Sequence, residues 1–193
     1  TIFNEKEMRV LARTGALNIF TDDRRRALWE ISEPFDQENL FSKSEDKSNT
    51  PSPLEIMTYI ERLRADYEGV GLTVGTHPMK WMRSNLKDCL SAQELEQGRH
   101  GLQIKIAGCV ICRQRPVTAK GFLFISLEDE TGISNSVVPP CVFMRNRLTI
   151  LHESYLIIAG SLQNIDGVAC VKAERFEALM DRHLPEGMSH DFR

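Results

Sequence analysis

The stretch LQIKIAGCVICRQRPVTAKGFLFISLEDETG, residues 102–132, decides the fold. It contains two apolar runs, 102–114 and 121–129, rich in the β-branched and aromatic residues that favour strands. Pro116 and the segment 130–132 supply turn residues after each run. The stretch therefore predicts two sequential β-strands joined by a short turn.

Three more runs of the same type follow: ISNSVV at 133–138, SYLIIAGSLQ at 154–163 and VACVKAERF at 168–176. The last two are separated by Asp166-Gly167, a strong turn signal. A helical or irregular insert, 141–153, lies between the third and fourth runs, where an OB-fold places its helix. The pattern predicts a five-stranded OB-fold β-barrel over residues 100–176.

The residues before the barrel predict helices. Apolar positions at helical spacing occur in 5–16, in a segment capped by Thr21 or Asp22 and ended by Pro34, in 54–68, and around 79–90. Residues 36–53 are polar and rich in Ser and Pro, which predicts a linker. The expected class is α+β, with a helical segment (1–35), a linker (36–53), a helical connector (54–99), the barrel (100–176) and a tail (177–193).

Composition limits the class of protein. With 41% hydrophobic and 26% charged residues and a net charge of -3, the chain is typical of globular domains. It has no apolar run near the ~18 residues that span a bilayer and no signal-peptide pattern at its start, so we expect a cytoplasmic protein with no membrane contact. Five scattered cysteines predict reduced thiols rather than a disulfide framework.

Specific motifs point to a family. AGCVICRQRP at 107–116, TAKG at 118–121 and LEDETG at 127–132 resemble the OB domain of bacterial error-prone DNA polymerases, C-family relatives of the DNA polymerase III alpha subunit. The resemblance continues through 160–163, Gly167 and 173–175, and the closing SHDFR at 189–193 looks like that family's C-terminus. Upstream, 11–17 and 25–29 resemble the end of its helix-hairpin-helix region, and 63–67 and 77–79 resemble its connector.

The resemblance implies a parent enzyme that synthesises DNA past damage during replication and repair (translesion synthesis) and needs Mg²⁺. A chain of 193 residues has no room for the family's palm, thumb and other catalytic regions. We therefore expect a fragment or a truncated reading frame, with no catalytic residues and no cofactor of its own, inactive alone as a nucleotidyltransferase. The expected partners are single-stranded DNA and, in the family, a sliding clamp and a translesion-polymerase-like protein.

The predicted nucleic-acid site combines cations with aromatic rings. Basic side chains hold phosphates while aromatic faces stack bases, which is how OB grooves bind single strands. Residues 100–176 hold eight Lys or Arg against six Asp or Glu, so the binding must come from local clusters. The candidates are Arg113, Arg115, Lys120, Phe122, Phe124, Arg145 and Arg147.

Two alternatives stay open at this stage. If Leu123, Ile125 and Leu127 fill the barrel, Phe122 and Phe124 face outward; in the reverse register both aromatics are core. The barrel could also be a protein-interaction module that contacts the clamp or the translesion partner. Its weak positive charge favours that rival somewhat.

Metal and hydrolytic chemistry are less favoured. Cys109 and Cys112 have the spacing of a zinc half-site that Cys141 and Cys170 could complete, but residues three apart on a regular strand face opposite ways. The acidic run 128–130 is better explained as a solvated turn. The thiols are expected to be small buried hydrophobes, and we predict no metal site.

Overall fold

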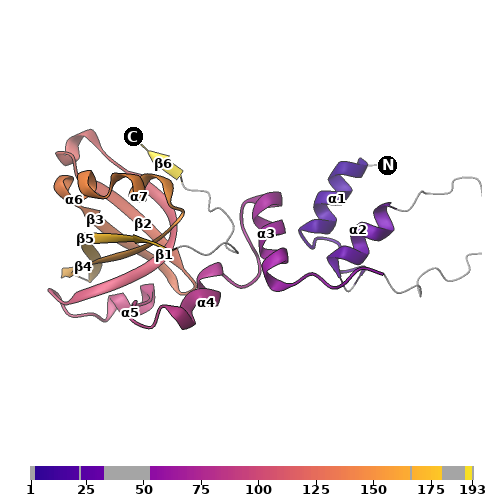
Figure 1. Cartoon of the computed structure of the whole chain (residues 1–193), viewed down its shortest axis with the longest axis horizontal. Helices are drawn as coiled ribbons and strands as arrows, with labels where there is room; N and C mark the ends of the chain where they lie inside the picture. The colour runs from indigo at the N-terminus through magenta and orange to yellow at the C-terminus, as the bar shows by residue number, and fades with distance from the viewer. Residues whose placement is uncertain (1–2, 22, 33–52, 166, 180–189, 193) are drawn as a thin grey trace, which may run out of the picture. The chain divides into compact units, whose positions relative to one another are not determined.

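A computed structural model describes residues 3–21, 23–32, 53–165, 167–179 and 190–192. The chain divides into two compact units, Thr1–Val74 and Gly75–Arg193, which are drawn in Figure 1 and are each described by themselves. Of the expected linker, 36–53, only Pro53 lies within the described residues. The expected connector, 54–99, is divided between the two units.

The first unit contains three helices, α1 (Glu5–Arg13), α2 (Arg24–Ser32) and α3 (Tyr59–Val70). Asn4 and Glu7 form a capping box at the start of α1, and Thr58 with Glu61 does the same for α3. In each box the side-chain oxygens accept from main-chain N–H groups that would otherwise have no partner. Helix α3 ends at Gly71, whose φ of 73° is a left-handed conformation that glycine adopts without strain.

One buried ion pair ties these three helices together. Arg24 and Asp66 are both nearly inaccessible, and Nη1 of Arg24 donates to Oδ1 of Asp66 at 2.5 Å. The same nitrogen donates to the carbonyl oxygens of Arg13 and Arg62, while the Thr73 hydroxyl donates to Asp66 Oδ2 at 2.7 Å. Both charges are thus paired and hydrogen-bonded, as burial requires.

The second unit is built on a closed five-stranded barrel. Its strands are β1 (Gln103–Gln114), β2 (Leu123–Asp129), β3 (Gly132–Val138), β4 (Tyr155–Ile165) and β5 (Val168–Ala178). The ladder runs β2-β3-β5-β4-β1 and closes through an antiparallel β1–β2 pairing, with β3 and β5 parallel. Helices α6 (Pro140–Arg145) and α7 (Arg147–His152) connect β3 to β4. This topology is the OB-fold that the strand pattern predicts, and it confirms the α+β class.

Alternate residues of each strand fill the barrel. Ile106 and Val110 of β1, Ile125 of β2, Leu156 of β4 and Val171 of β5 are almost fully buried. This inside-out alternation follows from the two-residue period of a strand. Phe143 and Ile150, on the inner side of α6 and α7, complete the same core.

Two short helices cover part of the barrel wall. Helix α4 (Pro78–Met82), the 3-10 turn η2 (Arg83–Asn85) and α5 (Ala92–Glu96) all belong to the second unit. Met79 and Met82 pack with Ala107, Cys109 and Tyr155 in a small satellite core. The outer face of β1 is therefore covered at this end, whereas Gln114 at the other end is exposed.

A sixth strand, which the sequence pattern does not predict, pairs with β1. Residues of β6 (His190–Phe192) run parallel to Cys112, Arg113 and Gln114. Strand β4 pairs with β1 only as far as Cys109, so this part of the β1 edge is available. The unpaired N–H and C=O groups of an open edge attract such a segment.

Candidate nucleic-acid interface

The outer face of β1, β2, β3 and β5 forms a mixed polar and apolar surface, which we call the platform. One row across it contains Gln114, Phe124, Val137 and Lys172, which are paired in that order. The next row contains Cys112, Ser126, Asn135 and Cys170. Directly opposite residues on paired strands share a face, so each row is a set of lateral neighbours.

The register of β2 settles which of its side chains the platform displays. Leu123, Ile125 and Leu127 are no more than 4% exposed, whereas Phe124 is 39% exposed. The Phe124 ring therefore faces outward. This excludes the reverse register, in which Phe124 would lie in the core. Phe122 lies just before the strand and is partly buried.

The loop between β1 and β2 contributes the basic end of the platform. Arg115 and Lys120 are exposed, and no ion pair among the described residues involves either. The loop contains the 3-10 turn η3 (Val117–Ala119), after which Lys120 takes a left-handed φ of 49°. The Arg115 guanidinium lies 4.9 Å from the ring centre of Phe143, a cation–π contact that orients it.

Arg113 is not on this surface, which corrects its place in the predicted set. It is 6% exposed, and its guanidinium donates to the carbonyl oxygens of Ile150 and Glu153, both at 2.7 Å. These are the carbonyls at and just beyond the end of α7, which have no partner within the helix. Arg113 therefore fastens α7 to β1.

We expect the Arg113→Met variant to lose about 2 kcal/mol of stability, because two charge-assisted hydrogen bonds disappear while the apolar stem is kept. Urea unfolding followed by fluorescence measures the loss. The salt dependence of DNA binding should not change. A reduced salt slope without loss of stability would contradict the structural role.

Arg145 and Arg147 lie elsewhere. Both are exposed, at the end of α6 and the start of α7, and they neighbour the exposed Met144 and Leu148. They project from the helices that close the barrel rather than from the strands of the platform. Arg115 and Lys120 are thus exposed in the loop that joins β1 to β2, and Phe124 is exposed on β2. Arg113 is buried, whereas Arg145 and Arg147 are exposed on α6 and α7, the helix pair whose Phe143 ring contacts the Arg115 guanidinium.

The acidic run 128–130 forms a structural clasp rather than a solvated turn. Oδ1 of Asp129 accepts from the N–H and hydroxyl groups of Thr131, both at 2.7 Å, and Oδ2 accepts from the Ala92 N–H at 2.8 Å. Arg83 donates to Asp129 and, twice, to Glu130. Burial disfavours ionisation, but these hydrogen bonds and Arg83 outweigh it and hold the pKa of Asp129 below its ordinary value.

His77 has a structural position at the start of α4. Its Nδ1 accepts from the Met79 N–H at 3.2 Å, which caps the helix. Its Nε2 lies 3.9 Å from a carboxylate oxygen of Glu128. Burial lowers the pKa of His77, while Glu128, Glu130 and Asp129 oppose that shift, so the ring is neutral near pH 7.

The cysteines correct one geometric expectation. A bulge between Val110 and Cys112 shifts the register, so Cys109 and Cys112 pair with Glu128 and Ser126, which share the outer face of β2. Both thiols therefore lie on the same side of β1, not on opposite sides. Burial raises the pKa of Cys109 to about 11, which disfavours the thiolate that a metal needs. Within the described ranges, no three His, Cys, Asp or Glu side chains gather as metal ligands.

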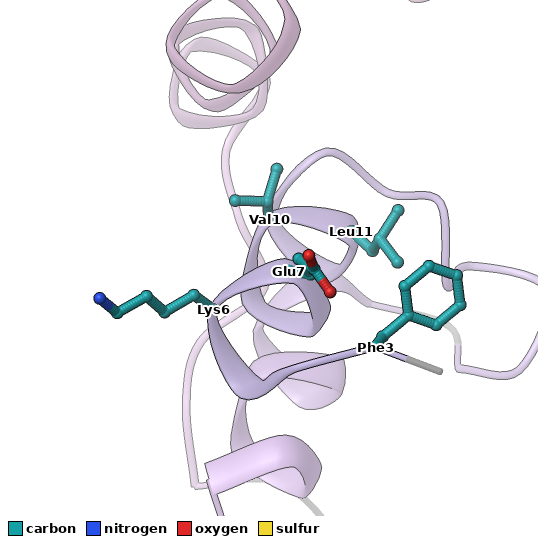
Figure 2. Close-up of a pocket in the computed structure, with 5 residues that line it drawn as sticks. All are labelled: Phe3, Lys6, Glu7, Val10 and Leu11. Atoms are coloured by element: carbon teal, nitrogen blue, oxygen red, sulfur yellow. The ribbon is translucent and has the colours of Figure 1, made fainter. Parts of the chain in front are cut away.

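A surface hollow in the first unit offers no second candidate. Figure 2 shows its lining on and just before α1: Phe3, Lys6, Glu7, Val10 and Leu11. The Glu7 carboxylate already accepts from the Asn4 N–H at 2.8 Å, so it serves as a helix cap. In the part of the chain that the structure describes, no helix has the length and apolar character of a membrane span.

Comparison with known proteins identifies the relatives. No family model matches the chain. It is 37% identical over 180 residues to the error-prone DNA polymerase of Idiomarina loihiensis, which covers 91% of this chain and 17% of that protein. The error-prone DNA polymerase of Pseudomonas aeruginosa is 35% identical, and the match covers 90% of this chain and 17% of that protein. The enzyme of the same name from Corynebacterium glutamicum is 34% identical, and the match covers 98% of this chain and 18% of that protein. The resemblance expected from the motifs is confirmed, and the chain spans less than one fifth of the length of these curated relatives.

Solved structures give weaker likenesses. Asparaginyl-tRNA synthetase from Pyrococcus horikoshii matches with a TM-score of 0.42 and 23% identity over 53% of this chain and 24% of that one. The hypothetical protein ygiW from E. coli matches with a TM-score of 0.35 and 9% identity, over 46% of this chain and 87% of that one. Both scores are low, so the fold assignment depends on the strand topology itself.

Proposed function

We propose that this chain, a relative of the error-prone DNA polymerases, is the part of such an enzyme that holds single-stranded template DNA during damage-tolerant synthesis. The observation that carries the proposal is the exposed Phe124 ring on the platform, with Arg115 and Lys120 exposed in the adjoining loop between β1 and β2. An aromatic face stacks on any base, and nearby cations attract the phosphates.

The polar side chains around Phe124 suit an unpaired strand. Ser126 and Asn135 are lateral neighbours whose side chains are hydrogen-bonded at 2.7 Å, and Gln114 lies beside Phe124. Amide and hydroxyl groups can bind base edges that are free only when the strand is single. These contacts favour single-stranded over duplex DNA.

The charges along β2 would orient the bound strand. The loop with Arg115 and Lys120 lies before the start of β2, whereas Glu128 lies near its end. Phosphates are attracted to the first end and repelled from the second, while Lys172 adds one cation in the row of Phe124. The strand therefore has about three phosphate contacts available.

We expect the whole chain to bind a labelled single-stranded oligonucleotide in fluorescence anisotropy, with about 20-fold loss of affinity between ~50 and ~200 mM salt for three phosphate contacts. Replacing both Arg115 and Lys120 with Ala should weaken binding about 10-fold at low salt and reduce the salt effect to about 3-fold, the value for one remaining contact. Phe124→Ala should weaken binding at both salt concentrations, because stacking is not ionic.

Lys80 and Lys87 provide the matched control, since both are exposed lysines of the same unit that lie outside the platform. Their double Ala variant should bind like the original chain. Equal losses for the two double variants would show that only net charge matters. Absence of binding even at low salt would favour the rival function, a module that contacts a clamp or a translesion partner.

A further inference from the structure

The outward side of α6 and α7 carries an apolar stripe that the barrel does not use. Met144, Leu148 and Leu151 are 68%, 75% and 40% exposed, while Phe143 and Ile150 on the opposite side are buried in the core. Leu148 and Leu151, three residues apart, lie on one face of α7, and Met144 lies on α6. Figure 1 shows both helices lying against the barrel strands.

The two helices meet at a single residue that is not itself helical, with φ -115° and ψ 19°. Asn146 lies between them, and its N–H donates to the Val142 carbonyl at 3.1 Å while its carbonyl accepts from the Ile150 N–H at 2.9 Å. Both are i to i−4 bonds of helical type. Met144, before the junction, and Leu148, after it, are both exposed on this helix pair.

The same surface is positively charged. Residues 140–152 contain two arginines and one histidine, and no Asp or Glu. Arg145 and Arg147 are exposed beside the stripe, and none of the ion pairs formed between described residues involves them. An apolar stripe with cations beside it is complementary to an apolar stripe with carboxylates beside it.

The secondary structure of the surface restricts its partner. A helix face lacks the alternating N–H and C=O groups of an open strand edge, so a partner cannot add to it as a strand. The partner must satisfy its own main-chain hydrogen bonds, and a helix does so. Nucleic acid fits poorly, since phosphates would lose water against Met144 and Leu148, and residues 140–152 expose no Phe, Tyr or Trp ring for stacking.

We propose that the outer face of α6 and α7 docks an acidic amphipathic helix of a partner protein. The inference is independent of template binding, because it uses Leu148 and its neighbours rather than the platform. It assigns Arg145 and Arg147 to this surface instead of to DNA. The contact is small, so we expect micromolar affinity and a transient complex.

The test uses the full chain and a labelled 18-residue synthetic helix with leucines on one face and glutamates beside them. We expect a dissociation constant on the order of tens of µM at low salt and at least ~10-fold weaker binding of a matched peptide with Lys for Glu. Leu148→Glu should weaken acidic-peptide binding at least ~10-fold, because it places a carboxylate within the apolar contact. An unchanged melting temperature verifies that this exposed-site variant is folded.

Phe124→Ala separates this surface from the platform. It should leave peptide binding unchanged and weaken oligonucleotide binding, whereas Leu148→Glu should do the reverse. The proposal is overturned if the acidic peptide binds no better than the lysine peptide, or if Leu148→Glu has no effect on it. It is also overturned if the Leu148→Glu or Arg145→Ala/Arg147→Ala variants lose oligonucleotide binding as strongly as Phe124→Ala does, since the helices would then belong to the DNA site.

Discussion

Replacing Gly160 with Ala is expected to lower the free energy of unfolding by about 3 kcal/mol or more, so that much of the barrel unfolds at moderate urea. A Cβ at this position would lie 2.1 Å from the carbonyl oxygen of Lys172 and 3.0 Å from the Cα of Ala173. Both are main-chain atoms of β5, which cannot rotate away as a side chain could. Gly160 also pairs with Ile104 of β1, so its own strand is held from both sides.

Tryptophan fluorescence can follow this loss in one unit alone. The chain has two tryptophans, Trp29 in α2 and Trp81 in α4, so a Trp29→Phe background leaves a reporter in the barrel unit. Gly167→Ala is the control, because its Cβ would meet nothing within 4 Å and only its φ of 81° is unfavourable. We expect Gly167→Ala to lower the free energy of unfolding by about 1 kcal/mol. Equal effects at the two glycines would refute the steric explanation.

The barrel could be predicted from the sequence because each strand is a local pattern. The runs around Ile106, Ile125 and Ile158 alternate or stay apolar over strand lengths, and turns separate them. Strand β6 could not be found this way, since three residues carry no periodicity. Its pairing depends on where β4 leaves β1, which is a tertiary feature.

The site residues were harder to predict because a β-bulge in β1 determines which of its side chains face outward. Strict alternation along β1 places Cys109 and Cys112 on opposite faces, but the irregularity between Val110 and Cys112 turns the second half of the strand over. No glycine or proline marks that position. Arg113 consequently points inward toward α7, whereas Arg115 lies beyond the end of β1 and is exposed.

The clasp around Asp129 shows how a motif can be read as functional when it is structural. LEDETG provides the carboxylate, its turn and the Thr131 donors, while Ala92 and Arg83 come from residues distant in sequence. An acidic run is therefore compatible with a turn, a metal site or a clasp until its distant partners are known. The clasp fastens α5 and η2 to the β2–β3 turn.

Asp129→Ala is accordingly expected to cost about 3 kcal/mol near pH 7, in the range for breaking one side of a buried ion pair. It leaves the Ala92 N–H without its acceptor and removes one of the carboxylates that pair with Arg83. Asp129→Asn should cost nearly as much, because its amide NH₂ would face the N–H of Ala92 and the Arg83 guanidinium, which are themselves donors. Asp88→Asn, at an exposed carboxylate of the same unit, should change stability by less than about 0.5 kcal/mol.

The pH dependence of the Asp129→Ala effect gives an independent check. The folded protein holds the pKa of Asp129 below its ordinary value of 3.8, so the ionised carboxylate stabilises the fold above that pH. The contribution is lost as the pH falls through the lower, folded pKa. Urea midpoints of the original chain and the Asp129→Ala variant should therefore differ most above about pH 4 and approach each other at lower pH. A difference that does not shrink as the pH falls below 3.8 would mean that the clasp does not use the charge of Asp129.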